Sequence, residues 1–181
     1  MQNLETIETP RLLLVRLNEK WMRKFSRNPK ESAEELENSL SLEHSGRTEH
    51  PPSAYQYACS EISRFPESAE WLCFWEVIHK KQRRRIGGML FKGPPDESGE
   101  VEIGYGIDTG FQRMGFGLEA VERGIQWAFS QGVCTVIAKV NPGNQASRRL
   151  LERAGLKQYR FIGKMPCYRI TRPVEGKSER I

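Results

Sequence analysis

The sequence predicts an α/β fold in which helices cover both faces of a mixed sheet. Two strand-like runs, 71–79 and 85–91, flank a short basic turn and precede a third at 101–107, a pattern typical of an antiparallel meander. Strand-like and helix-like segments then alternate to the end, which requires crossover connections. With 181 residues the chain is long enough for one substantial core, so we expect one domain over 1–172.

The N-terminal third contains a strand followed by helices. Alternation predicts the first strand over 9–17. Apolar residues in charged surroundings then indicate two helical pieces interrupted by Pro29, which we expect to border the acceptor site. A further helix is predicted over 53–64, with Ser53 near its start.

The remaining elements follow from apolar runs and turn residues. Leu118, Val121, Ile125 and Phe129 lie on one helical face, and the next strand is predicted over 133–140. A helix ending near Ala154 precedes two strands at 159–163 and 167–171. The polar tail, 173–181, is expected to be disordered.

The composition disfavours several classes of protein. Charged residues make up 28% of the chain, and we find no run of 18 apolar residues, so we expect neither a membrane span nor a signal peptide and place the protein in the cytoplasm. The cysteines have no metal-type spacing and are expected to be reduced, packed thiols; they are Cys59, Cys73, Cys134 and Cys167. His44, His50 and His79 show no ligand spacing, so no metal is predicted.

The net charge of +5 is concentrated partly in the basic run 80–85. A basic run between strands is usually a solvated turn, and we prefer that interpretation to an RNA-contacting patch. This interpretation disfavours nucleic acid as a partner, although the run leaves a ribosomal or otherwise anionic partner open.

The segment 112–118 joins a predicted strand to a predicted helix through a basic turn with two glycines. Gly115 and Gly117 can adopt positive φ, and the first N–H groups of the following helix have no intrahelical acceptor. These donors and the helix dipole favour an anion, and Arg113 adds a positive charge. The segment therefore has the properties of a pyrophosphate-binding turn.

Several motifs in order resemble those of the GNAT acyl-CoA N-acyltransferases. They are Gln112, Arg113, Gly115 and Gly117, then Asn144, Ser147 and the ending Ala154, Gly155 and Leu156. The opening 9–14, the strand at 86–88 and the segment 102–105 are similar to the subgroup of ribosomal-protein N-terminal (alanine/serine) acetyltransferases. The resemblance covers about residues 7 to 170.

The resemblance implies a GNAT-type mixed, mostly antiparallel central sheet of about six to seven strands, with helices on both faces. It also implies transfer of an acetyl group from acetyl-CoA to a primary amine by direct attack in a ternary complex. The amine is either a protein N-terminus, ribosomal proteins included, or a small amine such as a polyamine, amino acid or antibiotic. The alternative is a catalytically weak acyl-CoA sensor or scaffold, and the protein is a monomer or a homodimer.

By the same resemblance, Tyr105 and Ile107 lie beside the pantetheine arm of the cofactor. Asn144 contacts that arm, although it is also a good helix N-cap. Ser147 and Arg148 face the outer part of the cofactor. The pyrophosphate is held by the main chain of Gln112, Arg113, Met114, Gly115, Phe116, Gly117 and Leu118.

The catalytic residues are expected on the same elements. Glu102 is the predicted general base, because a glutamate serves this role on this strand in some relatives; an exposed strand glutamate is the alternative. Many relatives carry a tyrosine where this chain has Leu151, so water or Ser147 is expected to protonate the departing thiolate. A covalent route through Cys134 is disfavoured because no histidine lies near it in the sequence.

Overall fold

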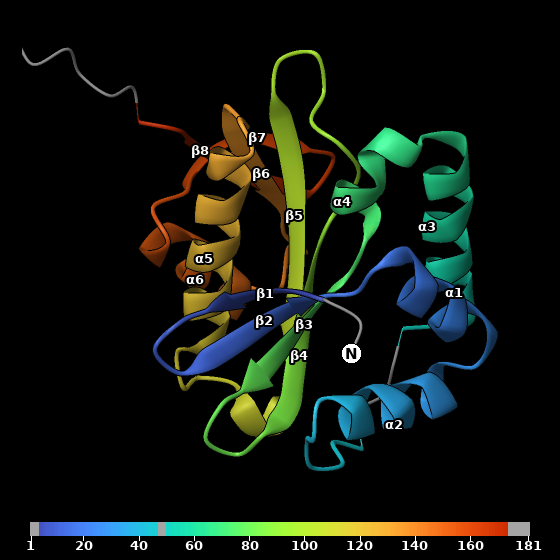
Figure 1. The fold of residues 1–181 in the computed structure, drawn as a ribbon. Helices are drawn as coiled ribbons and strands as arrows, with labels where there is room; N and C mark the ends of the chain where they lie inside the picture. The colour runs from blue at the N-terminus through green and yellow to red at the C-terminus, as the bar shows by residue number, and fades with distance from the viewer. Residues whose placement is uncertain (1–3, 47–49, 174–181) are drawn as a thin grey trace, which may run out of the picture.

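A single eight-stranded sheet organises the protein in the computed structural model, which describes residues 4–46 and 50–173 (Figure 1). Its strand order is β1-β2-β3-β4-β5-β6-β8-β7. The strands are β1 (Glu5–Glu8), β2 (Leu12–Arg16), β3 (Trp75–His79), β4 (Arg84–Phe91), β5 (Glu100–Ile107), β6 (Thr135–Lys139), β7 (Lys157–Ile162) and β8 (Met165–Thr171).

The pairing confirms the predicted mixed sheet. Neighbouring strands are antiparallel throughout, β3 and β4 included, except for the parallel pair β5 and β6. The strand count of six to seven was too low, because the short edge strand β1 buries Ile7 alone among its residues. Four residues with one buried side chain give no readable alternation.

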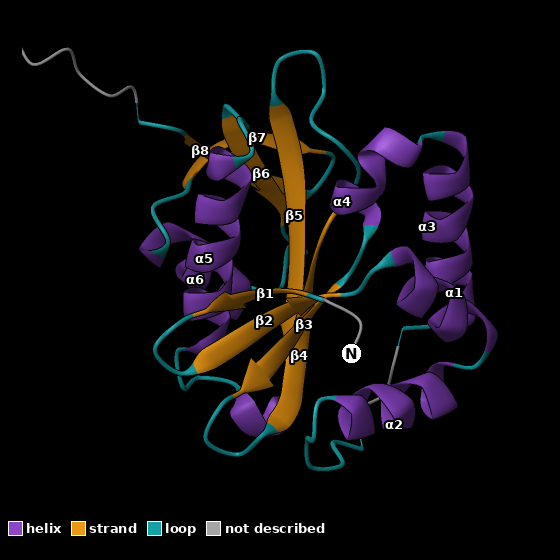
Figure 2. Ribbon diagram, viewed as in Figure 1, coloured by secondary structure: helices purple, strands orange, loops and turns teal. Residues whose placement is uncertain are grey.

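The helices are α1 (Glu19–Arg27), α2 (Pro29–Ser39), α3 (Pro52–Arg64), α4 (Ala69–Leu72), α5 (Phe116–Ser130) and α6 (Gln145–Arg153), with short 3₁₀ turns at Pro66–Ser68 and Thr109–Phe111. Asn28 ends α1 and caps α2, and Pro29 occupies the first turn of α2, so the predicted interruption is confirmed. Figure 2 shows α5 and α6 on one side of β5 and α1 to α3 on the other.

One predicted strand began too early. The run 71–79 starts in α4, and β3 begins at Trp75. Trp71 packs against Phe91 and Trp127, with ring centroids 5.4 and 4.9 Å away. This aromatic packing uses the same apolar residues that suggested a strand, so tertiary contacts override the local pattern.

Two hydrophobic clusters form the core. The larger cluster lies between the sheet and α5, and includes Leu12, Val77, Ile103 and Val121. The smaller one joins α1, α2 and α3 around Phe25. Helices thus lie on both sides of the sheet, as predicted (Figure 2), and β5 lies near its centre.

The basic run 80–85 is only partly a solvated turn. Arg85 belongs to β4 and is fully buried, with its guanidinium paired to Glu76 at 3.0 Å and to Glu37 at 3.3 Å. Arg84 donates a hydrogen bond to the Ser45 carbonyl at 2.6 Å. These arginines connect the sheet to α2 and the segment after it, which sequence spacing alone did not reveal.

Three smaller expectations concern the chain as a whole. Cys59, Cys73 and Cys167 are buried as expected, but Cys134 is exposed, because it precedes β6. Within the described residues, no helix has the length and apolar character needed to cross a bilayer. The predicted tail 173–181 lies outside the described residues except for its first residue.

Candidate active site

The sheet opens between β5 and β6. These parallel strands pair only through Glu100, Val101 and Glu102, whose partners are Thr135, Val136 and Ile137. Residues 103–107 of β5 pair with β4 on the other side. Beyond Glu102, β5 therefore has a partner along one edge, and its other edge faces a gap.

The main-chain groups along that open edge follow from the register. The hydrogen bonds Lys92 N–H to Glu102 O and Asp108 N–H to Ile86 O, both 2.9 Å, mark the hydrogen-bonded pairs of the β4–β5 ladder. In an antiparallel ladder such pairs alternate, so the groups of Ile103, Tyr105 and Ile107 point away from β4. Of these residues, Tyr105 and Ile107 lie beyond the last pair with β6, and the Ile107 carbonyl already accepts a hydrogen bond from the Gln112 side chain.

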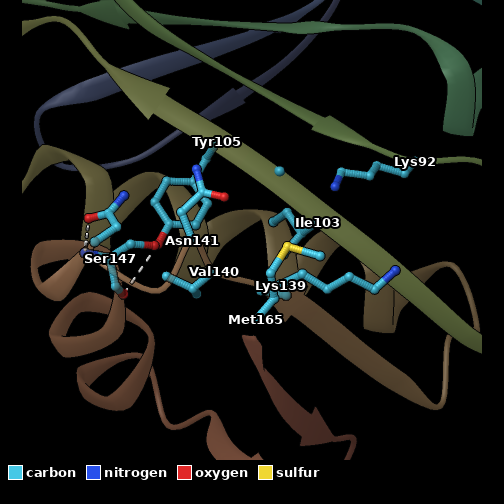
Figure 3. Close-up of a pocket in the computed structure, with 11 residues that line it drawn as sticks. Lys92, Ile103, Tyr105, Lys139, Val140, Asn141, Ser147 and Met165 are labelled. Atoms are coloured by element: carbon cyan, nitrogen blue, oxygen red, sulfur yellow. Dashed lines mark hydrogen bonds between the residues drawn. The ribbon is translucent and has the colours of Figure 1, made fainter. Parts of the chain in front are cut away.

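A cavity of about 310 Å³ lies at this opening (Figure 3). It is lined by β5, by the end of β6 and the turn after it, and by the start of α6. Its lining residues are Lys92, Ile103, Gly104, Tyr105, Ala138, Lys139, Val140, Asn141, Asn144, Ser147 and Met165.

The predicted phosphate turn follows the same strand. Arg113 and Gly115 both have positive φ, +62° and +84°, and Gly115 is the N-cap of α5 without a side-chain capping bond. The turn thus needs two left-handed residues, one of which is not glycine. Gln112, Arg113 and Met114 are exposed, and the Gln112 side chain donates to the Ile107 carbonyl at 2.8 Å.

Gly117 has a different reason to be glycine. It lies inside α5, and a Cβ at this position would be 2.9 Å from Leu150 Cδ1 and 3.4 Å from Ile107 Cγ1. Gly117 does not use its freedom to adopt positive φ; it lets α5 approach α6 and β5 closely. At Gly115 a Cβ would be 3.1 Å from Arg11 Nη2.

Arg11, in the turn between β1 and β2, contacts the predicted phosphate turn. Its guanidinium donates to the Met114 carbonyl at 2.9 Å and to Glu119 at 2.7 Å, and lies 4.5 Å over the Phe116 ring. Thr9 donates to the same Glu119 carboxylate at 2.6 Å. Burial would raise the pKa of Glu119, but the bonds from Thr9 and Arg11 outweigh it and hold that pKa below its usual value.

On the α6 side, Asn144 caps the helix by accepting the Ser147 N–H at 2.9 Å, and it also lines the cavity. The Ser147 hydroxyl lies 2.8 Å from the Tyr105 hydroxyl. Burial raises the pKa of Tyr105, against the smaller opposite effect of this hydrogen bond. A protonated phenol therefore sits beside Ser147 at neutral pH.

Glu102 lies between two lysines. Its carboxylate pairs with Lys139 at 2.6 Å and with Lys92. Burial would raise the pKa of Glu102, but the hydrogen bonds and charges of the two ammonium groups lower it below its ordinary value. The carboxylate is ionised at neutral pH, and it is not an isolated strand glutamate.

Several residues singled out by the sequence lie outside the cavity lining, Glu102, Ile107 and 112–118 among them. Leu151 is fully buried in the larger hydrophobic cluster. Arg148 donates to the Pro142 carbonyl at 2.8 Å. Cys134 precedes β6 at the end opposite Lys139, so it does not border the opening.

Sequence reasoning missed Arg11, Lys92 and Lys139. Arg11 contacts Met114 and Glu119 across more than 100 residues of chain. Lys92 and Lys139 follow or end strands, where a lone lysine carries no signal of its own. Alternation placed Glu100 and Glu102 on one face of their strand and gave no sign of the lysines.

Comparison with known proteins agrees with this geometry. The family described as "Acetyltransferase (GNAT) domain" matches residues 10–157. The uncharacterized N-acetyltransferase YjdG of Bacillus subtilis is 34% identical over 82 residues, which are 45% of this chain and 49% of the relative. The chain therefore spans about half the length of that curated relative in the match.

Solved structures share the fold at low sequence identity. The ribosomal-protein-S5-alanine acetyltransferase of Vibrio fischeri has a TM-score of 0.60 at 16% identity, over 92% of this chain and 96% of that one. An acetyltransferase of Agrobacterium tumefaciens has a TM-score of 0.60 at 20% identity, over 95% and 97%. RimJ of Mycobacterium smegmatis, in complex with CoA-disulfide, has a TM-score of 0.61 at 15% identity, over 93% and 86%.

Proposed function

Because the chain belongs to the GNAT acetyltransferase family, we propose that it is an enzyme that moves an acetyl group from acetyl-CoA to a primary amine. The amine attacks the thioester directly while both substrates are bound. The acceptor is a protein N-terminus, a ribosomal protein included, or a small amine. The solved relatives whose names mention ribosomal proteins support the first of these by analogy alone.

The observation that carries the proposal is the arrangement along β5. The strand leaves β6 after Glu102, offers main-chain groups to a cavity, and ends near a turn with two left-handed residues at the start of α5. An extended arm with amide groups fits the open edge, because it can continue the sheet's hydrogen bonding. A pyrophosphate fits the turn, because the N–H groups there have no helical acceptor.

In this proposal the main chain of Tyr105 and Ile107 holds the pantetheine arm, and residues 112–118 hold the pyrophosphate. Asn144 keeps its capping bond and presents its amide to the arm. Acetyl-CoA supplies the activated acetyl group, as a thioester. Arg148 stays a predicted contact with the outer part of the cofactor.

Ser147 and Tyr105 are the proposed route for a proton to the departing sulfur. The hydroxyl of Ser147 lies at the cavity, and the phenol behind it keeps its proton at neutral pH. The phenol of this chain thus comes from β5. Many relatives instead carry a phenol on the later helix, at the position that Leu151 of α6 occupies here. Glu102 remains the predicted general base, acting on the amine directly or through one water.

The test begins with isothermal titration of acetyl-CoA into the wild type and Gly115→Glu. We expect micromolar binding by the wild type and none by the variant, whose side chain adds a bulky anion at positive φ. Gly132→Glu is the matched control, because Gly132 also has positive φ, +89°, in open space. No binding by a folded wild type would refute the proposal.

The rival function is an acyl-CoA sensor or scaffold without turnover. A panel of amines, followed by mass spectrometry, separates the two. Acetylated product that depends on Glu102 and Ser147 supports the enzyme. Stoichiometric binding of acetyl-CoA without product from any amine supports the sensor.

A further inference from the structure

The cavity has a cationic end. Among its described lining residues, the charged ones are Lys92 and Lys139, and none is acidic. Figure 3 shows these two lysines toward one end of the cavity, and Tyr105 beside Ser147 toward the other. Charge is thus distributed unevenly along the site.

The two lysines lie beside the Glu102 end of β5, too far from the predicted phosphate turn to contact a pyrophosphate there. Lys92 and Lys139 meet at Glu102, and the strand runs five further residues to Ile107 before the phosphate turn begins. At the usual rise for a strand, this is about 17 Å. Under the proposed function, the lysines therefore border the thioester end, where the acceptor arrives.

The charge of this end is not cancelled. Two ammonium groups share the single Glu102 carboxylate, which leaves one positive charge, and the Lys92 side chain is 51% exposed. On the neighbouring strands, Arg169 of β8 lies opposite Ile137 and also opposite Lys157 of β7; neither basic residue lines the cavity. Glu100, one pleat from Glu102, is the opposing charge on β5.

We propose that the acceptor amine carries an anionic group, a carboxylate, close to the nitrogen that is acetylated, and that Lys92 and Lys139 bind it. The inference rests on the proposed function and narrows its substrate class. An acidic N-terminal peptide or an amino acid fits this end of the cavity. A polyamine or a polycationic antibiotic meets like charge and is rejected.

A matched pair of bisubstrate analogues tests the inference without requiring turnover. In each, the sulfur of CoA is joined through an acetyl bridge to the N-terminus of an amidated tripeptide, Ala-Asp-Glu in one and Ala-Asn-Gln in the other. We expect the acidic analogue to bind at least about tenfold more tightly, because a charge-assisted contact is stronger than a neutral one. Added salt should reduce the difference.

Variants of the two lysines test whether they cause the preference for the acidic analogue. In Lys92→Met/Lys139→Met the preference should fall to within about threefold, and in Lys92→Arg/Lys139→Arg it should persist. Lys81→Met is the control, because Lys81 is an exposed lysine in the turn between β3 and β4. A merely structural role would weaken both analogues equally.

Turnover of the two free tripeptides and of spermidine is measured in parallel. Equal affinity for the two analogues, or faster acetylation of spermidine than of the acidic peptide, would overturn the inference and leave the enzyme proposal standing. Tight binding of the acidic analogue without acetylation of any amine would support the binding site and contradict the proposed activity.

Discussion

Tyr105 and Ser147 meet through their hydroxyl groups although 42 residues separate them in the chain. Ser147→Ala should lower kcat by about tenfold with little change in KM for acetyl-CoA. The loss is modest because a CoA thiolate is a tolerable leaving group without an acid. Steady-state kinetics check it.

If the two hydroxyls act as one unit, Tyr105→Phe should have a similar effect, and the double variant should be no slower than the slower single one. Fully additive losses would show that they act independently. An unchanged kcat in Ser147→Ala would remove the residue from the catalytic route.

Glu102 is the residue whose proposed role depends most on its neighbours. Its pKa is lowered, so it is ionised across neutral pH and is a weak base. We expect Glu102→Gln to lower kcat by about a hundredfold, at the small end of the range for general bases. The measurement is kcat against pH from 6 to 9.

The dependence of wild-type kcat on pH between 6 and 9 should reflect the titration of the acceptor amine, because the pKa of the Glu102 carboxyl lies below its ordinary value of 4.5. Lys92→Met removes one ammonium group and should raise the pKa of Glu102 toward that value. If kcat of Glu102→Gln matched that of the wild type, the Glu102 carboxylate would position the two lysines and would not act as the general base.

At the scale of elements, Arg85 links β4 to β3 and α2 through two buried carboxylates. Arg85→Ala should reduce the free energy of unfolding by about 3–5 kcal/mol, because it leaves Glu37 and Glu76 buried without this cation. Urea denaturation measures the change. Lys81→Ala, at an exposed position of the adjoining turn, should change it little.

If the free energy of unfolding of Arg85→Ala equalled that of the wild type, water would have to reach the Glu37 and Glu76 carboxylates in the variant. The burial of Arg85 also bears on whether the basic run 80–85 contacts RNA, because a buried arginine is not exposed to a partner. Replacing 83–85 together would disturb the fold, so Arg83 and Lys81 are the positions at which RNA retention should be tested.

The contact between the β1–β2 turn and α5 should depend on pH. Glu119 has a lowered pKa in the folded protein, so its contribution to stability is present above the ordinary carboxyl value of 4.5 and is lost as pH falls through the lowered value. Wild type should lose stability more steeply than Glu119→Gln below about pH 4.5. Denaturation at pH 3 to 7 checks this slope.

The same contact predicts a cofactor effect. Arg11→Gln should weaken acetyl-CoA binding by about tenfold, since the guanidinium holds the Met114 carbonyl at the phosphate turn. Arg11→Lys should restore part of the affinity. Unchanged binding in both variants would show that the turn is rigid without Arg11.

At the scale of the whole molecule, the cofactor is proposed to bridge β5, α5 and α6, which belong to one hydrophobic cluster. Acetyl-CoA at a hundred times its Kd should therefore add about 2.7 kcal/mol to the free energy of unfolding. This corresponds to a Tm increase of about 5–10 °C for a chain of this size.

Thermal unfolding with and without acetyl-CoA measures the shift. Gly115→Glu should show none, and Gly132→Glu should shift like the wild type. A wild type that unfolds at the same temperature with and without the ligand would contradict cofactor binding.

The sequence by itself determined the order of most elements and the position of the glycine-containing turn before α5. These features depend on residues close together in the chain: apolar spacing sets α5, and the glycines at 115 and 117 follow the strand at 101–107. It also supported the mixed sheet, because alternating strands and helices allow few connections. The sequence did not reveal the start of β3 or the edge strand β1. The apolar run before β3 is shared with a helix, and the alternation of β1 is weak.

Tertiary structure alone decided the environment of each site residue. Arg11 reaches the turn before α5, Lys92 and Lys139 meet at Glu102, and Tyr105 meets Ser147 across distances in sequence that no motif records. Whether a carboxylate is paired or free, and therefore its pKa, depends on which strands become neighbours. Strand pairing is fixed by packing of the entire sheet, so the meeting of two lysines at the cavity became visible only in the folded molecule.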